Sequence, residues 1–316
     1  MWSDLPLFPQ RASSIAGRVD ELYLFLVAVA GFFSVLIFTL VLIFAIRYRR
    51  RSADERPKAI LGSLPLELLW TVVPLVITMV MFGWGTWLYF RNLRIPAGTM
   101  EVYVVGKQWM WKLQHPEGPS EINELHVPVN VPVRLVMTSE DVIHSFYVPA
   151  FRIKQDVLPG RYTSIWFHPT RPGKYHLFCA EYCGTQHSSM GGWVYVMSAP
   201  DYQQWLTGGG SAESMASKGQ ALYERFGCNG CHMPDGSGRG PSLAGLLGRK
   251  VVMDSGEAVV ADEGYIRESI LNPRAKLAAG YKAIMPTFQG QVSEDQLVQL
   301  LAYIKSQKTA ERTATE

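Results

Sequence analysis

The sequence predicts a multidomain protein: a two-helix transmembrane hairpin, then an all-β barrel or sandwich, then an all-α domain. Three observations support this order. Two long apolar stretches without charge come first, short alternating stretches between turn residues follow, and helical patterns occupy the C-terminal part. A chain of 316 residues is long enough for two or three such units.

The transmembrane hairpin is placed in residues 1–94. Residues 22–46 and 68–90 carry no charged side chain, and each stretch exceeds the roughly 20 apolar residues that cross a bilayer as a helix. Two such stretches favour membrane spans over buried core helices, and the first is too long for the apolar core of a signal peptide. The loop between them is rich in arginine, which places it in the cytoplasm and everything after Phe90 outside.

The all-β domain is placed in residues 95–206. Stretches such as 100–105 and 132–137 alternate in polarity, and turn signals such as Pro159–Gly160 bound them. This spacing is typical of a sandwich or barrel. Residues 207–213 are rich in glycine and predict a flexible linker.

The all-α domain is placed in residues 214–316. Its expected helices are 215–226, 263–271 and 293–306. Ser293 and Gln296 predict a capping box at the start of the last helix. Residues 233–256 are rich in glycine, so we expect mostly loop there.

Charge and cysteine content narrow the function classes. The chain has 30 basic and 27 acidic residues, so its net charge indicates no nucleic-acid partner. Its four cysteines are Cys179, Cys183, Cys228 and Cys231. In an oxidising compartment, two disulfides are the simplest expectation. Each pair, however, belongs to a more specific motif.

The first motif runs Cys179-Ala-Glu-Tyr-Cys183-Gly-Thr-Gln-His187-Ser-Ser-Met190, with His144 upstream. Thiolate, thioether and imidazole ligands together favour copper, and a site for a single blue copper needs only one cysteine. The second cysteine therefore indicates two thiolates that bridge a pair of coppers, with Met190 and the Glu181 carbonyl as weak axial ligands. A zinc site with two cysteines and two histidines and a copper-delivery protein are the alternatives.

The second motif, Cys228-Asn-Gly-Cys231-His232, is the attachment sequence of c-type haem. The two thiols add to the haem vinyl groups, and His232 becomes the proximal iron ligand. Methionine is the expected sixth ligand. Met285 is the candidate and Met253 its competitor, whereas Met233 adjoins the proximal ligand and cannot reach the opposite face of the haem.

Residues 20–205 resemble subunit II of the haem-copper cytochrome c oxidases. The motifs that carry the resemblance are Ser139-Glu-Asp-Val-Ile-His144-Ser, Gly106-Lys-Gln-Trp-Met-Trp111, Leu158-Pro-Gly-Arg161 and the cysteine loop. The resemblance implies a cupredoxin-like barrel that holds a binuclear copper A centre. Its implied ligands are His144, Cys179, Glu181, Cys183, His187 and Met190.

The same resemblance implies roles for three further positions. Trp109 matches the aromatic residue where electrons enter. The Glu181 side chain is implied to reach a magnesium ion at the interface with subunit I, and Glu67 to lie at the mouth of a proton channel into that subunit. Glu140 and Asp141 are expected to help dock a cationic cytochrome. Four other histidines, namely His115, His126, His168 and His176, are expected to be ordinary residues of the β domain.

The C-terminal domain resembles a class I cytochrome c, with Met285 in the position of the methionine ligand. Together, the resemblances imply the electron-transfer subunit of a caa-type cytochrome c oxidase, an enzyme whose oxygen-reducing, proton-pumping site lies on subunit I. Implied partners are subunits I and III, with cytochrome c or a quinol–cytochrome c reductase as donor. The implied location is the bacterial inner membrane, with two spans and with both redox domains on the periplasmic side. The alternative is the small subunit of a copper-containing nitric oxide reductase.

Overall fold

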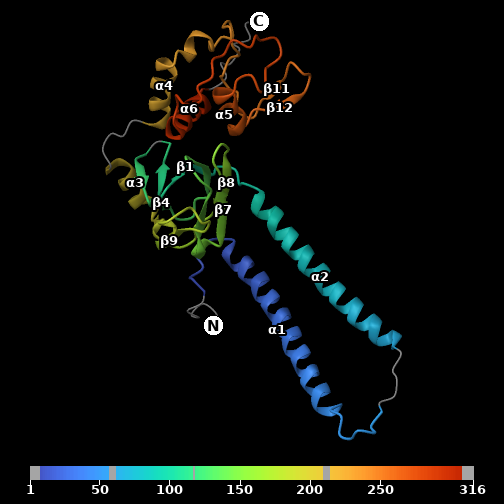
Figure 1. The fold of residues 1–316 in the computed structure, drawn as a ribbon. Coiled ribbons are helices and arrows are strands. Elements are labelled where there is room, and N and C mark those ends of the chain that lie inside the picture. The colour runs from blue at the N-terminus through green and yellow to red at the C-terminus, as the bar shows by residue number, and fades with distance from the viewer. Residues whose placement is uncertain (1–7, 57–61, 117, 209–213, 308–316) are drawn as a thin grey trace, which may run out of the picture. The chain divides into compact units, whose positions relative to one another are not determined.

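The computed structural model describes residues 8–56, 62–116, 118–208 and 214–307 (Figure 1). It divides into two compact units. One consists of residues 15–95, and the other combines residues 1–14 with residues 96–316. Most of the predicted linker, residues 209–213, lies outside the described residues.

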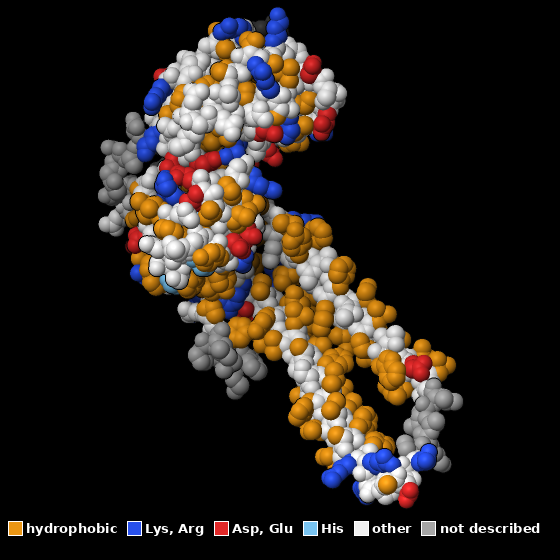
Figure 2. All heavy atoms as spheres, in the orientation of Figure 1, with side chains coloured by type: hydrophobic (Ala, Val, Ile, Leu, Met, Phe, Trp, Pro, Cys, Tyr) orange, Lys and Arg blue, Asp and Glu red, His pale blue; other side chains and the backbone are white. Residues whose placement is uncertain are grey.

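The smaller unit consists of two long helices, α1 (Ala16–Arg47) and α2 (Leu64–Leu93), which contain the two predicted spans. Both are long and apolar enough to cross a membrane, and their most apolar segments are not buried within the chain. Apolar side chains cover the visible surface of both helices (Figure 2). Pro74 interrupts the hydrogen bonding of α2, and the Thr78 hydroxyl donates to its carbonyl at 2.9 Å.

The larger unit begins with a sandwich of two five-stranded sheets, which confirms the predicted all-β domain. The first sheet has the order β3-β2-β1-β5-β8 and the second the order β4-β10-β9-β6-β7. The strands of the first sheet are β1 (Met100–Lys107), β2 (Met110–Gln114), β3 (Ser120–Ile122), β5 (Val133–Ser139) and β8 (Thr163–Phe167). Those of the second are β4 (Glu124–Pro128), β6 (His144–Val148), β7 (Ile153–Val157), β9 (Gly173–Cys179) and β10 (Gly191–Met197). Large side chains such as Trp111, Phe146 and Phe167 are fully buried in the domain.

A short helix, α3 (Ala199–Gly208), follows the last strand and was not predicted. Its end includes Thr207 and Gly208, which were expected to begin the linker. The Ser198 hydroxyl accepts from the Asp201 N–H and so caps the helix. Tyr202 and Trp205 of α3 pack on His115. The signal in the sequence was Ser198 followed by Pro200 and Asp201, which is typical of a helix start.

The C-terminal domain is helical, as predicted. Its helices are α4 (Met215–Arg225), α5 (Glu263–Leu271) and α6 (Glu294–Ser306). The expected capping box of Ser293 and Gln296 is present. Gly219 allows α4 to approach α6 closely, because a Cβ there would collide with the Gln299 carbonyl. The segment expected to be mostly loop contributes one strand, β11 (Lys250–Val252), to a hairpin with β12 (Ala258–Val260).

Candidate copper and haem sites

Three segments of the β domain supply the predicted copper ligands. His144 begins β6 and Cys179 ends β9, and these strands are antiparallel neighbours with Phe146 opposite Cys179. The sheet therefore places both ligands at the same end of the sandwich. The loop between β9 and β10 contributes the others: Glu181, Cys183, His187 in the short helix His187–Ser189, and Met190 just before β10.

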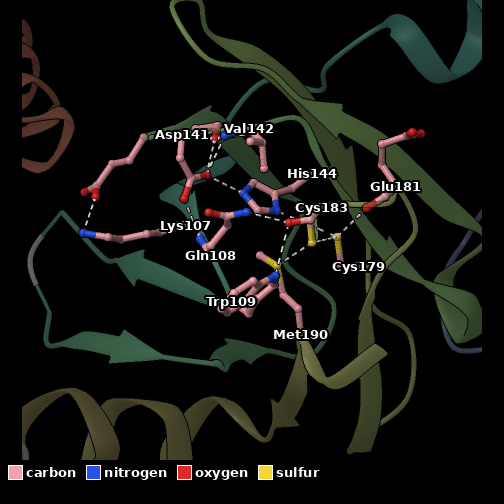
Figure 3. A network of polar contacts seen from close by, with 12 residues as sticks. Lys107, Gln108, Trp109, Asp141, Val142, His144, Cys179, Glu181, Cys183 and Met190 are labelled. Carbon is pink, nitrogen blue, oxygen red and sulfur yellow. Dashed lines mark hydrogen bonds and ion pairs between the residues drawn. The ribbon is translucent and has the colours of Figure 1, made fainter. Parts of the chain in front are cut away.

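All six predicted donors come together around the two cysteine sulfurs, and Figure 3 labels all of them except His187. The two sulfurs lie 3.8 Å apart. Cys179 Sγ is 4.0 Å from His144 Nδ1 and 3.3 Å from the Glu181 carbonyl oxygen. Cys183 Sγ is 3.5 Å from His187 Nδ1 and 3.7 Å from Met190 Sδ.

The electrostatics of the pair suit a metal. Burial by itself raises the pKa of the Cys179 thiol. Hydrogen bonds with His144, His187 and the backbone outweigh burial, so the pKa falls to about 6. Burial and the neighbouring Cys179 thiolate raise the pKa of Cys183 to about 12. Two buried thiolates at this separation repel each other unless a cation lies between them. The donor set, two thiolates with imidazoles and a thioether, therefore fits copper.

Asp141 orients the first of these ligands. Its Oδ1 accepts a hydrogen bond from His144 Nε2 at 2.8 Å, and its Oδ2 accepts from the Gln108 N–H at 2.7 Å. Because Nε2 is the donor, Nδ1 keeps its lone pair, which is directed at the sulfurs. Metal-binding histidines commonly donate their other ring N–H to a carboxylate in this way. Sequence reasoning missed this role and expected Asp141 to help dock a cytochrome. Its neighbour Glu140 instead pairs with Lys107 at 2.9 Å and with Lys112 at 2.8 Å.

Trp109 lies directly against the cysteine loop. Its Nε1–H and the Gln108 side-chain amide both donate to the Cys183 carbonyl, at 3.2 Å and 2.8 Å. Gly184, with a φ of +115°, makes this approach possible, because a Cβ there would lie 3.0 Å from Gln108 and 3.2 Å from Trp109. The predicted electron-entry residue is thus hydrogen-bonded to the backbone of a predicted ligand.

The helical domain contains an apolar cavity lined by the whole predicted haem set, namely Cys228, Cys231, His232 and Met285. His232 Nδ1 lies 2.8 Å from the Pro241 carbonyl, which accepts its proton and leaves Nε2 for iron. Gly240 is required beside this ring, because a Cβ would lie 2.7 Å from it. Met253 lies instead in the apolar core, paired with Ala278 in an isolated bridge.

Cationic side chains complete the lining of the cavity. These are Arg239, Arg249, Lys276 and Lys282. A haem is a flat apolar group with two carboxylates, so apolar walls with cations among them match both parts of it. The residues present therefore fit a c-type haem.

The other predicted positions have simpler surroundings. Glu67 lies in the first turn of α2, where its carboxylate accepts from the Ser63 N–H at 3.3 Å. The carboxylate of Glu181 is exposed and points away from the sulfurs (Figure 3). His126 is more than an ordinary residue of the β domain, because it stacks between Tyr195 and Trp205 and pairs with the buried Glu121.

Comparison with known families agrees with this layout. Residues 1–83 match the family described as cytochrome c oxidase subunit II, transmembrane domain, and residues 120–197 match its periplasmic domain. Residues 216–308 match cytochrome c.

Individual relatives cover most of the chain. Cytochrome c oxidase subunit 2 of Alkalihalophilus pseudofirmus is 28% identical over 300 residues, which are 90% of this chain and 86% of the relative. The Synechocystis subunit 2 is 31% identical over 261 residues, 66% of this chain and 78% of the relative. Among solved structures, the periplasmic domain of subunit II from Bradyrhizobium japonicum is 31% identical, with a TM-score of 0.35, and covers 36% of this chain and 94% of its own.

Two membrane-spanning helices, a thiolate-rich β-sandwich and a helical haem-binding domain define a membrane-anchored electron-transfer protein. The chain belongs to the cytochrome c oxidase subunit II family and carries a C-terminal cytochrome c domain. Membership implies a copper A centre, a haem, and association with subunit I in an oxidoreductase complex of the membrane. The domain after the helices is periplasmic, as in the family.

Proposed function

We propose that this chain is the electron-transfer subunit of a caa-type cytochrome c oxidase. Its haem-binding domain receives electrons from cytochrome c or a quinol–cytochrome c reductase and passes them to the copper-binding domain. That domain delivers them to subunit I, which reduces oxygen and pumps protons in a complex that also includes subunit III. The observation that carries the proposal is the presence of six copper donors and a complete haem-attachment motif on one chain.

The two cysteines, with the other four donors, are proposed to hold a pair of coppers. Cys179 and His144 form one side of the cluster, and Cys183 and His187 form the other. The Glu181 carbonyl lies on the Cys179 side and Met190 on the Cys183 side. When bound, the pair supplies a one-electron centre whose charge is shared between two metals. The strand ends hold the ligands in place, which keeps the geometric change on electron transfer small.

In the haem domain, Cys228 and Cys231 are proposed to form the thioether bonds, with His232 and Met285 as the iron ligands. Histidine with methionine raises the potential of a haem, which suits a donor to copper. The Tyr223 hydroxyl donates to the His232 carbonyl at 2.7 Å and so holds the backbone of the proximal ligand. The haem supplies one-electron chemistry when bound.

Three further roles are part of the proposal. Trp109 is the electron-entry residue of the copper domain, supported by its hydrogen bond to the Cys183 carbonyl. The exposed Glu181 carboxylate is available for a magnesium ion shared with subunit I. Glu67, at the predicted cytoplasmic end of α2, is the entrance of a proton channel, since ionisable groups at membrane depth commonly mark ion and proton pathways.

Metal analysis tests the copper assignment. The purified complex is expected to contain a pair of coppers in this chain, with an electron-resonance spectrum in which one unpaired electron couples to both nuclei. Cys183→Ser should abolish that spectrum. The matched control is Ser188→Ala, an exposed position in the same loop, which should leave it unchanged. A single copper or a zinc ion in the wild type is the contradicting result.

Substrate consumption tests the class of oxidase. The intact complex is expected to consume oxygen, and Glu67→Gln should lower proton pumping while the copper spectrum stays unchanged. Consumption of nitric oxide in place of oxygen would favour the alternative, a nitric oxide reductase whose small subunit has the same domains.

A further inference from the structure

The central strands of the first sheet, β1 and β5, are buried on both faces. Along β1, Val102 and Val104 are fully buried in the domain core, and alternation turns Tyr103 and Val105 to the opposite face. Tyr103 and Val105 are nevertheless only 2% exposed. On β5, Val136 is 1% exposed. The sheet is mixed, because β1 and β5 run parallel and the other strand pairs are antiparallel. A sheet face that is open to water carries polar side chains, so another part of the protein must cover this face.

The haem domain is the part that covers it. One apolar cluster contains Tyr103 and Val136 of the sheet together with buried residues of α5 and α6. The helix residues of the cluster include Tyr265, Ile266, Val298, Leu301, Ala302 and Ile304. Helix α6 contacts β1 directly (Figure 1). The two redox domains therefore share an apolar interface.

Four charged side chains of alternating sign lie at this interface, two from each domain. We call them the charge square: Glu101 and Arg134 of the sheet, and Glu263 and Lys305 of the haem domain. Arg134 Nη1 lies 3.0 Å from Glu101 and 3.1 Å from Glu263. Lys305 Nζ lies 3.4 Å from Glu263 and also pairs with Glu101. Each acid thus contacts both cations.

The charge square is only partly shielded from solvent. Its side chains are 12% to 24% exposed. Burial raises the pKa of Glu263, but Arg134 and Lys305 outweigh it and lower the pKa below its ordinary value. Pairs that water and ions can reach are weakened by salt, whereas fully buried pairs are not. The square therefore responds to ionic strength.

Two more groups of contacts join the haem domain to the β domain. Arg267 of α5 is 9% exposed, donates to the Gly160 carbonyl at 2.6 Å and pairs with Glu294. Lys112 of β2 joins Asp295, at the start of α6, to Glu140 beside the copper ligands, at 2.7 Å and 2.8 Å. The interface thus contains a buried arginine, Arg267, and a buried tyrosine, Tyr103, together with partly exposed charged side chains. This composition is usual for a specific interface.

We propose that the outer face of the sheet β3-β2-β1-β5-β8 is the docking surface for the chain's own haem domain, with Arg267 as its anchor and the charge square as a salt-sensitive clasp. The haem domain then works from a docked position and is not a freely diffusing tethered carrier. While it is docked, an external cytochrome cannot use this face of the copper domain. The significance of docking for electron delivery rests on the proposed function.

Radical footprinting of the full-length chain in its complex tests the docking. Hydroxyl radicals label exposed tyrosines, and mass spectrometry gives a rate for each position. Tyr103 is expected to react as slowly as Tyr175, which is 7% exposed and lies within the second sheet, and far more slowly than Tyr103 of the denatured chain. A Tyr103 rate equal to that in the denatured chain would overturn the proposal.

Charge reversal tests the clasp. Arg134→Glu places three acids against Lys305 and should raise the labelling rate of Tyr103 by about tenfold, with a similar rise in the wild type at high salt. Adding Glu263→Arg restores opposite charges across the interface and should return the rate to within about twofold of wild type. Lys154→Glu, which removes an exposed pair with Asp156 on β7, is the matched control and should change nothing.

The outcomes separate this proposal from the proposed function. A Tyr103 rate that does not respond to Arg134→Glu contradicts the clasp, whatever the complex reduces. Failure of electron delivery with Tyr103 still protected counts against the proposed function and leaves the docking surface in place.

Discussion

The copper site and the haem cavity present similar ligands but are built in different ways. Around the copper site, every predicted donor already lies within 4.0 Å of a cysteine sulfur, because the ends of β6, β9 and β10 hold the segments that carry them. In the haem domain, the ligands line an apolar cavity among loops and short helices. A site at the ends of a rigid sheet is preformed, whereas an apolar cavity depends on its contents for packing.

The contrast implies different consequences of losing each cofactor. The β-sandwich has its own apolar core of large side chains and should stay folded without metal. The buried apolar residues of the helical domain fall into two clusters, and one of these clusters also includes Tyr103 and Val136 of the β domain. Anything that binds the folded state stabilises it, so haem should contribute strongly to the stability of this domain.

The largest effect is expected from replacing both attachment cysteines, Cys228→Ala together with Cys231→Ala. Without either thiol no thioether can form, so no haem should remain on the denatured chain, as measured by haem staining. The helical domain should unfold at a lower temperature, while the copper spectrum persists. Parallel loss of both cofactors would show that the copper domain depends on the haem domain for its metal site.

Two methionines sharpen the haem half of the comparison. Met285→Ala should remove the long-wavelength sulfur–iron absorption band, because Met285 lines the cavity. Met253→Ala should keep that band and lower the stability of the domain by about 2–5 kcal/mol, the usual cost of truncating a buried methionine. A band that survives in the Met285 variant and is lost in the Met253 variant reverses the assignment.

Asp141→Asn sharpens the copper half. The amide is nearly the same size but weakens the hydrogen bond that orients His144, so copper affinity should fall by about 10–100-fold. Competition with a copper chelator measures this. Asp156→Asn is the control. The Asp156 carboxylate accepts from the Ser145 hydroxyl at 2.8 Å and bonds to no ligand side chain. Equal copper affinities in the two variants would contradict the role of Asp141 in orienting His144.

A smaller effect concerns the attachment of α3 to the sandwich. Burial raises the pKa of Glu121, but its bonds to His115 and His126 outweigh burial and lower it below 4.5. Because the folded-state pKa is the lower one, the stabilisation is full above about 4.5 and disappears as the pH falls through the folded-state value.

Glu121→Gln should therefore cost about 1 kcal/mol near neutral pH and much less in acid, as measured by thermal unfolding of the β domain in the full chain. Glu124→Gln, at an exposed position of β4, provides the comparison. A cost for Glu121→Gln that does not change with pH would exclude the carboxylate as its source.

Local patterns explain why so much was predictable. Three patterns are formed by residues that are close in the sequence, and they could therefore be recognised without the structure. These are the two apolar stretches, the capping box at Ser293 and the Cys228–His232 motif. Helix α3 has a local start signal at Ser198, but its packing depends on a distant segment, since Trp205 stacks on His126. The short hairpin β11–β12 was missed because its apolar residues Val251 and Val259 pack against a cluster formed by distant segments. Propensity describes such segments poorly because tertiary packing overrides it.

By itself, the sequence determined the membrane hairpin, the class of each domain and the ligand types of both candidate sites, because apolar length, periodicity and ligand spacing are local properties. Only the tertiary structure decided that Asp141 supports His144 and that Met285, not Met253, lines the cavity. It also decided that the apolar outer face of β1 and β5 is covered by the haem domain. These are contacts between residues far apart in the chain, and they are set by strand register and helix packing, which no local pattern records.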